Sequence, residues 1–232
     1  MIFRRRSKTT DDQSGSDAVE ASSDRDAEGT DSEQPALSSG RTRGPWDRSE
    51  TRADEDDPQY VDLGGLVVRG RAGLELRLQV DEQTQTVASV LLAGPQSGLE
   101  LRAFAAPRHD GLWDDVRTDI AAEAANRGGT ATELEGEWGT ELKVVVPVRT
   151  ADGRKASQAS RIVGIDGPRW LLRGTFLGRS ATEQDPDGEL AAAFRDVIVV
   201  RGEGPMAPRA MLALTMPSGA EIVTGDEDGA AD

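Results

Sequence analysis

The chain has 232 residues, a formal net charge of −15 and no cysteine. Without cysteine, disulfide bonds and thiolate-bound zinc or iron–sulfur centres are excluded. No run approaches the ~18 consecutive apolar residues that a membrane span needs, and the basic start at residues 1–6 lacks the apolar stretch of a signal peptide. These features predict a soluble cytoplasmic protein that does not bind a membrane.

The charge is distributed unevenly along the chain. Residues 1–57 contain 15 acidic and 9 basic residues, residues 58–217 contain 22 and 18, and residues 218–232 contain 5 acidic and none that is basic. The two end segments are also poor in apolar residues, so burial cannot offset the entropy lost on folding. We therefore expect two disordered acidic tails, 1–57 and 218–232, around a single domain of residues 58–217. A domain so close to charge balance argues against general nucleic-acid binding, which needs a basic excess.

Strands are predicted over much of this domain because apolar and polar residues alternate. The run 74–80 is typical of a strand with one face in solvent. Other segments rich in β-forming residues are 86–92, 99–104, 142–148, 160–165 and 169–177. Asp152-Gly153 and Asp166-Gly167 are turn dipeptides that each connect two such segments as a hairpin. The sheet is therefore expected to be largely antiparallel.

Two segments have helical rather than strand periodicity. Between Asp110 and Arg127 an apolar stripe recurs at helical spacing, with Asp110 as the expected N-cap; its members are Trp113, Val116, Ile120 and Ala124. A shorter helix is expected from Gly188 to Asp196, followed by 197–200 as a strand or as a continuation of the helix. The predicted fold class is α+β: a largely antiparallel sheet with two helices packed on one face.

Several motifs in fixed order resemble those of a known family. They are Arg41-Thr42-Arg43-Gly44-Pro45-Trp46-Asp47, Val61-Asp62-Leu63-Gly64, Leu74-Glu75-Leu76-Arg77, Ala103-Phe104-Ala105-Ala106-Pro107-Arg108, Gly111-Leu112-Trp113, Gly136-Glu137-Trp138-Gly139-Thr140-Glu141-Leu142, Gly164-Ile165-Asp166-Gly167-Pro168-Arg169-Trp170 and Met206-Ala207-Pro208-Arg209. Over residues 44–216 the chain is similar to the actinobacterial domain-of-unknown-function family numbered thirty-seven ten.

This resemblance implies an actinobacterial, cytoplasmic protein, often encoded beside deoxyuridine triphosphatase and a small OB-fold nucleic-acid-binding protein. The family has no agreed activity and therefore no catalytic residues to transfer. The order of elements is also similar to that of Mog1/PsbP-like sandwiches, which is an analogy of fold alone.

No catalytic, cofactor-binding or metal-binding residues are predicted. His109 is the single histidine and is expected to be exposed at the helix entry. Asp115, Asp119 and Glu123 recur every four residues, which suits a solvated helix face with Arg117 and Arg127 nearby as partners better than a metal site. Two further acidic groups have similar structural interpretations. Asp185-Pro186-Asp187-Gly188-Glu189 lacks the length of a calcium loop and suits a helix cap, and Glu133, Glu135 and Glu137 suit a charged edge strand.

The candidate binding residues are aromatic or basic. The tryptophans are Trp46, Trp113, Trp138 and Trp170. The last three are expected in the core, or else lining a binding groove. Trp46, in the predicted tail, is expected to dock on the domain or on a partner.

Four arginines are expected to share one exposed sheet face: Arg69, Arg71, Arg77 and Arg102. Such a face suits single-stranded nucleic acid, although ion pairs with Glu75 and Glu100 across neighbouring strands explain the same residues. The leading functional hypothesis is a non-enzymatic binding or adaptor protein without a cofactor and with a protein partner. The alternative is a nucleic-acid- or nucleotide-associated module that uses Arg69, Arg77 and Arg102.

Overall fold

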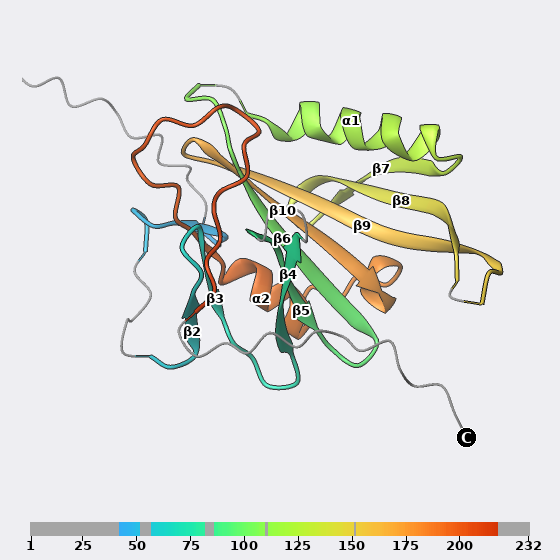
Figure 1. Ribbon diagram of the computed structural model, residues 1–232, viewed down its shortest axis with the longest axis horizontal. Helices are drawn as coiled ribbons and strands as arrows, with labels where there is room; N and C mark the ends of the chain where they lie inside the picture. The colour runs from blue at the N-terminus through green and yellow to red at the C-terminus, as the bar shows by residue number, and fades with distance from the viewer. Residues whose placement is uncertain (1–41, 52–56, 82–85, 110, 151, 218–232) are drawn as a thin grey trace, which may run out of the picture. The chain divides into compact units, whose positions relative to one another are not determined.

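The computed structural model describes residues 42–51, 57–81, 86–109, 111–150 and 152–217 (Figure 1). Its centre is a seven-stranded antiparallel sheet in the order β4-β5-β6-β10-β9-β8-β7. The strands of this large sheet are β4 (Glu75–Asp81), β5 (Thr86–Ala93), β6 (Ser97–Ala105), β7 (Thr130–Gly136), β8 (Gly139–Arg149), β9 (Lys155–Gly167) and β10 (Trp170–Gly178). A smaller sheet has the order β1-β11-β3-β2 and consists of β1 (Trp46–Asp47), β2 (Tyr60–Asp62), β3 (Leu66–Arg69) and β11 (Ile198–Val199).

The two predicted hairpins are present in the large sheet. Strands β8 and β9 pair around the Asp152-Gly153 turn, as expected. In the next hairpin Trp170 pairs with Gly167, so the turn residues are Pro168 and Arg169, two positions later than predicted. Arg169 has φ 62°, a left-handed conformation that closes a tight turn. Asp166 therefore stays in β9, where its side chain is available for a different contact.

The Asp166 side chain contacts the N-terminus of helix α1 (Trp113–Asn126). This helix confirms the longer of the two predicted helices. The Asp166 carboxylate accepts hydrogen bonds from the backbone N–H groups of Leu112 (2.8 Å) and Trp113 (3.2 Å). Backbone donors in the first turn of a helix have no partner within the helix, so a carboxylate there stabilises it. The cap thus comes from a strand more than 50 residues away, whereas the predicted cap, Asp110, lies outside the described residues.

The two helices lie on opposite faces of the large sheet, which corrects the prediction that both pack on one face. Leu171 of β10 belongs to the apolar cluster beneath α1, whereas its neighbours Trp170 and Leu172 belong to the cluster that contains Phe194 of α2 (Glu189–Arg195). Successive side chains of a strand point to opposite faces. Figure 1 shows α1 along one side of the sheet, and α2 with the small sheet on the other.

The small sheet places part of the predicted N-terminal tail within the fold. Strand β1 pairs in parallel with β11, and Trp46 packs against the cluster formed by Val67 and Ile198. The neighbouring Asp47 accepts a 2.6 Å hydrogen bond from the indole Nε1 of Trp170, whose side chain is fully buried. The structured region therefore includes residues before the predicted boundary at residue 58.

In the described part of the chain, neither helix has the length and apolar character required to cross a membrane.

Replacing Asp166 with alanine should lower the free energy of unfolding by about 1 kcal/mol, because two N-terminal amides of α1 lose their acceptor. Urea unfolding followed by circular dichroism measures the loss. Asp187→Ala is the matched control, since that carboxylate is exposed and caps no described helix. Equal stability of the two variants would contradict this role of Asp166.

A chain that begins at residue 42 should be more stable than one that begins at residue 58. The longer chain keeps β1, whereas the shorter one leaves the buried Trp170 N–H without Asp47, a cost of about 1–3 kcal/mol. Thermal unfolding of the two truncated chains makes the comparison. Equal midpoints would mean that β1 contributes nothing to the fold.

Candidate functional site

A cleft of about 640 Å³ opens on the α2 side of the large sheet. It lies between α2, the short 3₁₀ helix η1 (Arg179–Ala181) and the turn that connects β5 to β6. Its lining combines apolar and polar side chains, among them Leu74, Pro95, Ser97, Arg161, Phe176, Ser180, Glu183, Asp185, Glu189 and Leu190. Its volume is within the range of about 300–1,000 Å³ that is usual for ligand sites.

The floor of this cleft, which we call the α2 cleft, is a buried arginine. The guanidinium of Arg161 lies 4.1 Å from the ring centroid of Phe176, and its side chain is 7% exposed. Its Nη1 donates to Glu141 Oε2 at 3.0 Å and its Nε donates to the carbonyl of Ser180 at 3.3 Å. The Trp138 ring centroid lies 5.8 Å from the same guanidinium. Four contacts thus fix the position of Arg161.

The partner of this arginine, Glu141, is fully buried. Transferring a carboxylate out of water costs several kcal/mol, which the ion pair with Arg161 offsets. One oxygen, Oε1, has no hydrogen-bond partner among the described residues. A Cβ at Gly136 would lie 2.0 Å from that oxygen, so glycine is required there for the carboxylate to fit. The sequence between Gly136 and Glu141 therefore builds the support beneath the cleft.

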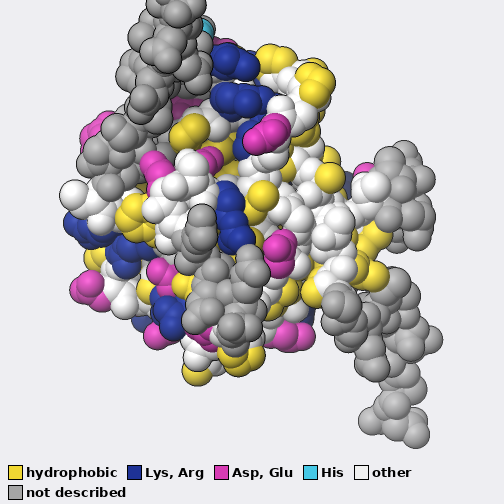
Figure 2. Space-filling view, turned by 90° about the vertical axis from the view of Figure 1, so that its left-hand side faces the viewer, with side chains coloured by type: hydrophobic (Ala, Val, Ile, Leu, Met, Phe, Trp, Pro, Cys, Tyr) yellow, Lys and Arg dark blue, Asp and Glu magenta, His cyan; other side chains and the backbone are white. Residues whose placement is uncertain are grey.

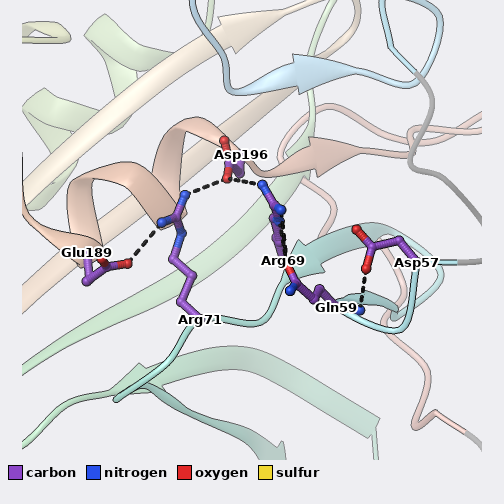
Figure 3. A network of polar contacts seen from close by, with 6 residues as sticks. All are labelled: Asp57, Gln59, Arg69, Arg71, Glu189 and Asp196. Atoms are coloured by element: carbon purple, nitrogen blue, oxygen red, sulfur yellow. Dashed lines mark hydrogen bonds and ion pairs between the residues drawn. The ribbon is translucent and has the colours of Figure 1, made fainter.

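One wall of the cleft is α2, which a polar network holds at both ends (Figure 3). Arg71 donates to Glu189 at 2.9 Å, at the start of α2, and to Asp196 at 2.6 Å, just after its end. Arg69 lies 3.7 Å from the same Asp196 oxygen and donates to Gln59. Burial lowers the pKa of Arg71, but its hydrogen bonds to Glu189 and Asp196 raise it by more, so the net shift is upward. Arg71 therefore stays charged and holds the wall in place.

The rim of the α2 cleft has more carboxylates than guanidinium groups. Glu183 is paired with Arg179 at 2.8 Å, and Glu189 is paired with Arg71. Asp185 is exposed and forms no ion pair with the residues that the structure describes. At the rim Asp185 thus offers a carboxylate that the described residues leave unpaired, above a floor whose own charge is neutralised.

The three domain tryptophans are mainly structural. Trp170 is fully buried, and Trp113 donates from Nε1 to the carbonyl of Thr140 at 2.8 Å. The Trp113 indole also covers Gly164, where a Cβ would lie 2.2 Å from the ring. Trp138 stacks on Phe176 with ring centroids 5.6 Å apart. It therefore supports the floor of the α2 cleft from behind without lining it.

The four candidate arginines do not share one sheet face. Arg69 is in β3 of the small sheet, and Arg71 contacts α2. Arg77 and Arg102 instead lie on the α1 face of the large sheet. Arg77 pairs with Glu75 at 2.6 Å and Arg102 with Glu100 at 2.5 Å, in each case two residues along the same strand and not across neighbouring strands. On the face drawn in Figure 2, acidic and basic side chains are interspersed.

The other candidates are at the surface. His109 is exposed, as predicted. Asp115 and Asp119 both contact Arg209, so their partner comes from the C-terminal segment; Arg117, which was expected in that role, binds Asp114 and Glu133 instead. Within the described ranges, no group of three or more His, Cys, Asp or Glu side chains is arranged to hold a metal ion.

Sequence patterns alone do not mark Arg161 and Glu141 as site residues. Both residues are in strands with many polar residues, where a charge is normally solvated. The available signal was Gly136 in the motif that leads to Glu141, because a glycine within a strand often marks a close approach.

Comparison with known families supports the predicted resemblance. The family model described as "Protein of unknown function (DUF3710)" matches residues 44–222, which is most of the chain, so the protein belongs to this family. No curated protein matches the sequence. The family description names no activity.

Replacing Arg161 with methionine should destabilise the domain by about 3–5 kcal/mol, because Glu141 is left buried and unpaired. The double variant Arg161→Met/Glu141→Leu should recover most of this loss, since no buried charge remains. Urea unfolding of both single variants and the double variant gives the coupling energy. Additive effects would show that the two residues do not interact.

Proposed function

We propose that this member of the DUF3710 family is a non-enzymatic cytoplasmic binding protein, an adaptor whose α2 cleft receives a basic segment of a protein partner. The supporting observation is the combination of a fixed floor at Arg161 with the carboxylate of Asp185 at the rim, which has no ion pair among the described residues. A catalytic role would need reactive groups that converge on a substrate, and the polar groups of this cleft are instead mostly paired with one another.

The cleft is arranged before any ligand binds. Arg161 is held by Glu141, by the Ser180 carbonyl and by the Phe176 ring, and α2 is held at both ends by Arg71. Side chains that are already ordered lose little conformational entropy on association, so more of the contact energy contributes to affinity.

The charge of the cleft favours a basic occupant. Asp185 is available for an ion pair, and Leu74 and Leu190 provide apolar surface for the aliphatic stem of a lysine or arginine. The net charge of −15 would increase the rate at which a basic segment is encountered.

The alternative function, association with nucleic acid or nucleotides, has less support. Arg69 lies apart from Arg77 and Arg102, which share the α1 face of the large sheet, and each of the three already lies beside a carboxylate. Binding of single-stranded DNA at low salt, lost on charge reversal of these three arginines, would favour this alternative over the adaptor.

Reversing one rim charge tests the proposal. Asp185→Lys should weaken capture of the partner about tenfold, a cost of about 1.4 kcal/mol, because it puts a positive charge where the basic segment binds. Asp187→Lys is the matched control, since this neighbouring carboxylate is exposed but outside the cleft.

The measurement is affinity capture from cell extract with quantitative mass spectrometry, using the wild type and both variants. The proposal predicts proteins that wild type and Asp187→Lys retain and Asp185→Lys loses. Equal capture by the two variants would contradict it.

A further inference from the structure

A second groove, of about 470 Å³, lies on the opposite face of the large sheet, between α1 and strands β8, β9 and β10. Its walls are mainly aliphatic, formed by Val116, Ile120, Val144, Val146, Ile162 and Leu177. Arg173 of β10 lines the groove as well. A guanidinium among aliphatic walls is unusual, because an unpaired charge is costly to remove from water.

Arg173 has no hydrogen bond or ion pair to any residue that the structure describes. Its Nε is buried without a partner, and its guanidinium lies 5.5 Å from the ring centroid of Phe104. Burial lowers the pKa of Arg173, and the charge of Arg102 lowers it further, against a smaller upward effect of Glu100. The surroundings of Arg173 therefore destabilise its positive charge.

The register of the sheet explains the conflict. Arg173 is directly opposite Arg102 on the neighbouring strand β6, and the nearby carboxylate, Glu100, is already bonded to Arg102 at 2.5 Å. Like charges directly opposite each other destabilise a pair of strands. Glu100 thus pairs with Arg102 and not with Arg173, so a second anion at this point would supply Arg173 with an acceptor.

The mouth of the groove does not supply that anion. Its acidic lining residues are Asp119, which Arg209 already binds, and Glu123, and neither forms an ion pair with Arg173. The groove as a whole therefore combines aliphatic walls with a guanidinium that no carboxylate of the described residues contacts.

We propose that this groove binds an anionic amphiphile, a carboxylate or phosphate headgroup on a single apolar chain. The headgroup pairs with Arg173 beside Arg102, and the chain lies between α1 and the β8–β9 side of the sheet against Val116, Ile120 and Val146. This site is independent of the α2 cleft, which lies on the other face of the large sheet.

Calorimetric titration of the full chain with octanoate, octyl phosphate and octanol tests the proposal. We expect at least one of the two anions to bind roughly tenfold or more tightly than octanol, because only the anions add the attraction of opposite charges to a hydrogen bond with the guanidinium. The stronger of octanoate and octyl phosphate identifies the headgroup. Failure of both anions to bind, or affinities equal to that of octanol, would overturn the proposal.

Two variants locate the site. Arg173→Met removes the charge and keeps an unbranched side chain, so the preference for anions over octanol should disappear, whereas Arg173→Lys should keep part of it. Arg117→Met is the control, since Arg117 pairs with Asp114 on the same helix and with Glu133 of β7 and does not line the groove. If Arg173→Met does not fold, the comparison of anion with alcohol on Arg173→Lys still decides. An anion preference unchanged in both Arg173 variants would refute the assignment.

Discussion

The buried ion pair between Arg161 and Glu141 is the interaction on which most of the α2 side depends. It links β9 to β8 beneath the surface of the cleft and holds one guanidinium against the Phe176 ring, on which Trp138 stacks. The same turn region reaches both helices, because Glu137 accepts from Arg195 in α2 at 2.6 Å and the Thr140 carbonyl accepts from Trp113 in α1. The short motif from Gly136 to Glu141 therefore connects two elements that lie on opposite faces of the sheet.

The two faces of the large sheet differ in how the charge of a buried or half-buried arginine is compensated. On the α2 side the ion pair with Glu141 offsets the desolvation cost of Arg161, so the floor of the α2 cleft is rigid. On the α1 side Arg173 is directly opposite Arg102, and its Nε has no acceptor among the described residues. The desolvation cost of Arg173 is therefore offset only when a ligand supplies an acceptor. A paired charge fixes the geometry of a site, whereas an unpaired cation in an apolar groove is stabilised by binding an anion. One sheet can in this way carry two chemically distinct binding sites.

Much of the fold could be predicted from the sequence, because the signals were local. The stripe through Trp113 and Ala124 identified α1, and the hairpin turn at Asp152-Gly153 set the pairing of β8 with β9. The face of each helix could not be predicted. Strand β10 is buried on both sides, so its sequence shows no alternation to indicate which face α1 covers.

The sites depended on contacts that are distant in the sequence. Strand β1 has two residues, too few for a periodic signal, and its place is fixed by partners such as Ile198 and Trp170. The opposition of Arg173 to Arg102 follows from the register between β10 and β6, which sequence patterns do not specify. The tryptophans Trp113, Trp138 and Trp170 make packing contacts and hydrogen bonds on the two sides of the large sheet, which link elements far apart in the sequence.

Site-specific photo-crosslinking tests most directly whether the α2 cleft is the binding surface. A photoreactive amino acid replaces Gln184, which lines the cleft, or Arg154, which is exposed at the distant β8–β9 turn, and the cells are irradiated. If the α2 cleft receives a basic segment, position 184 should give a discrete cross-linked protein that is missing from position 154, with a linked peptide rich in lysine or arginine. The same products from both positions, or none from position 184, would contradict it.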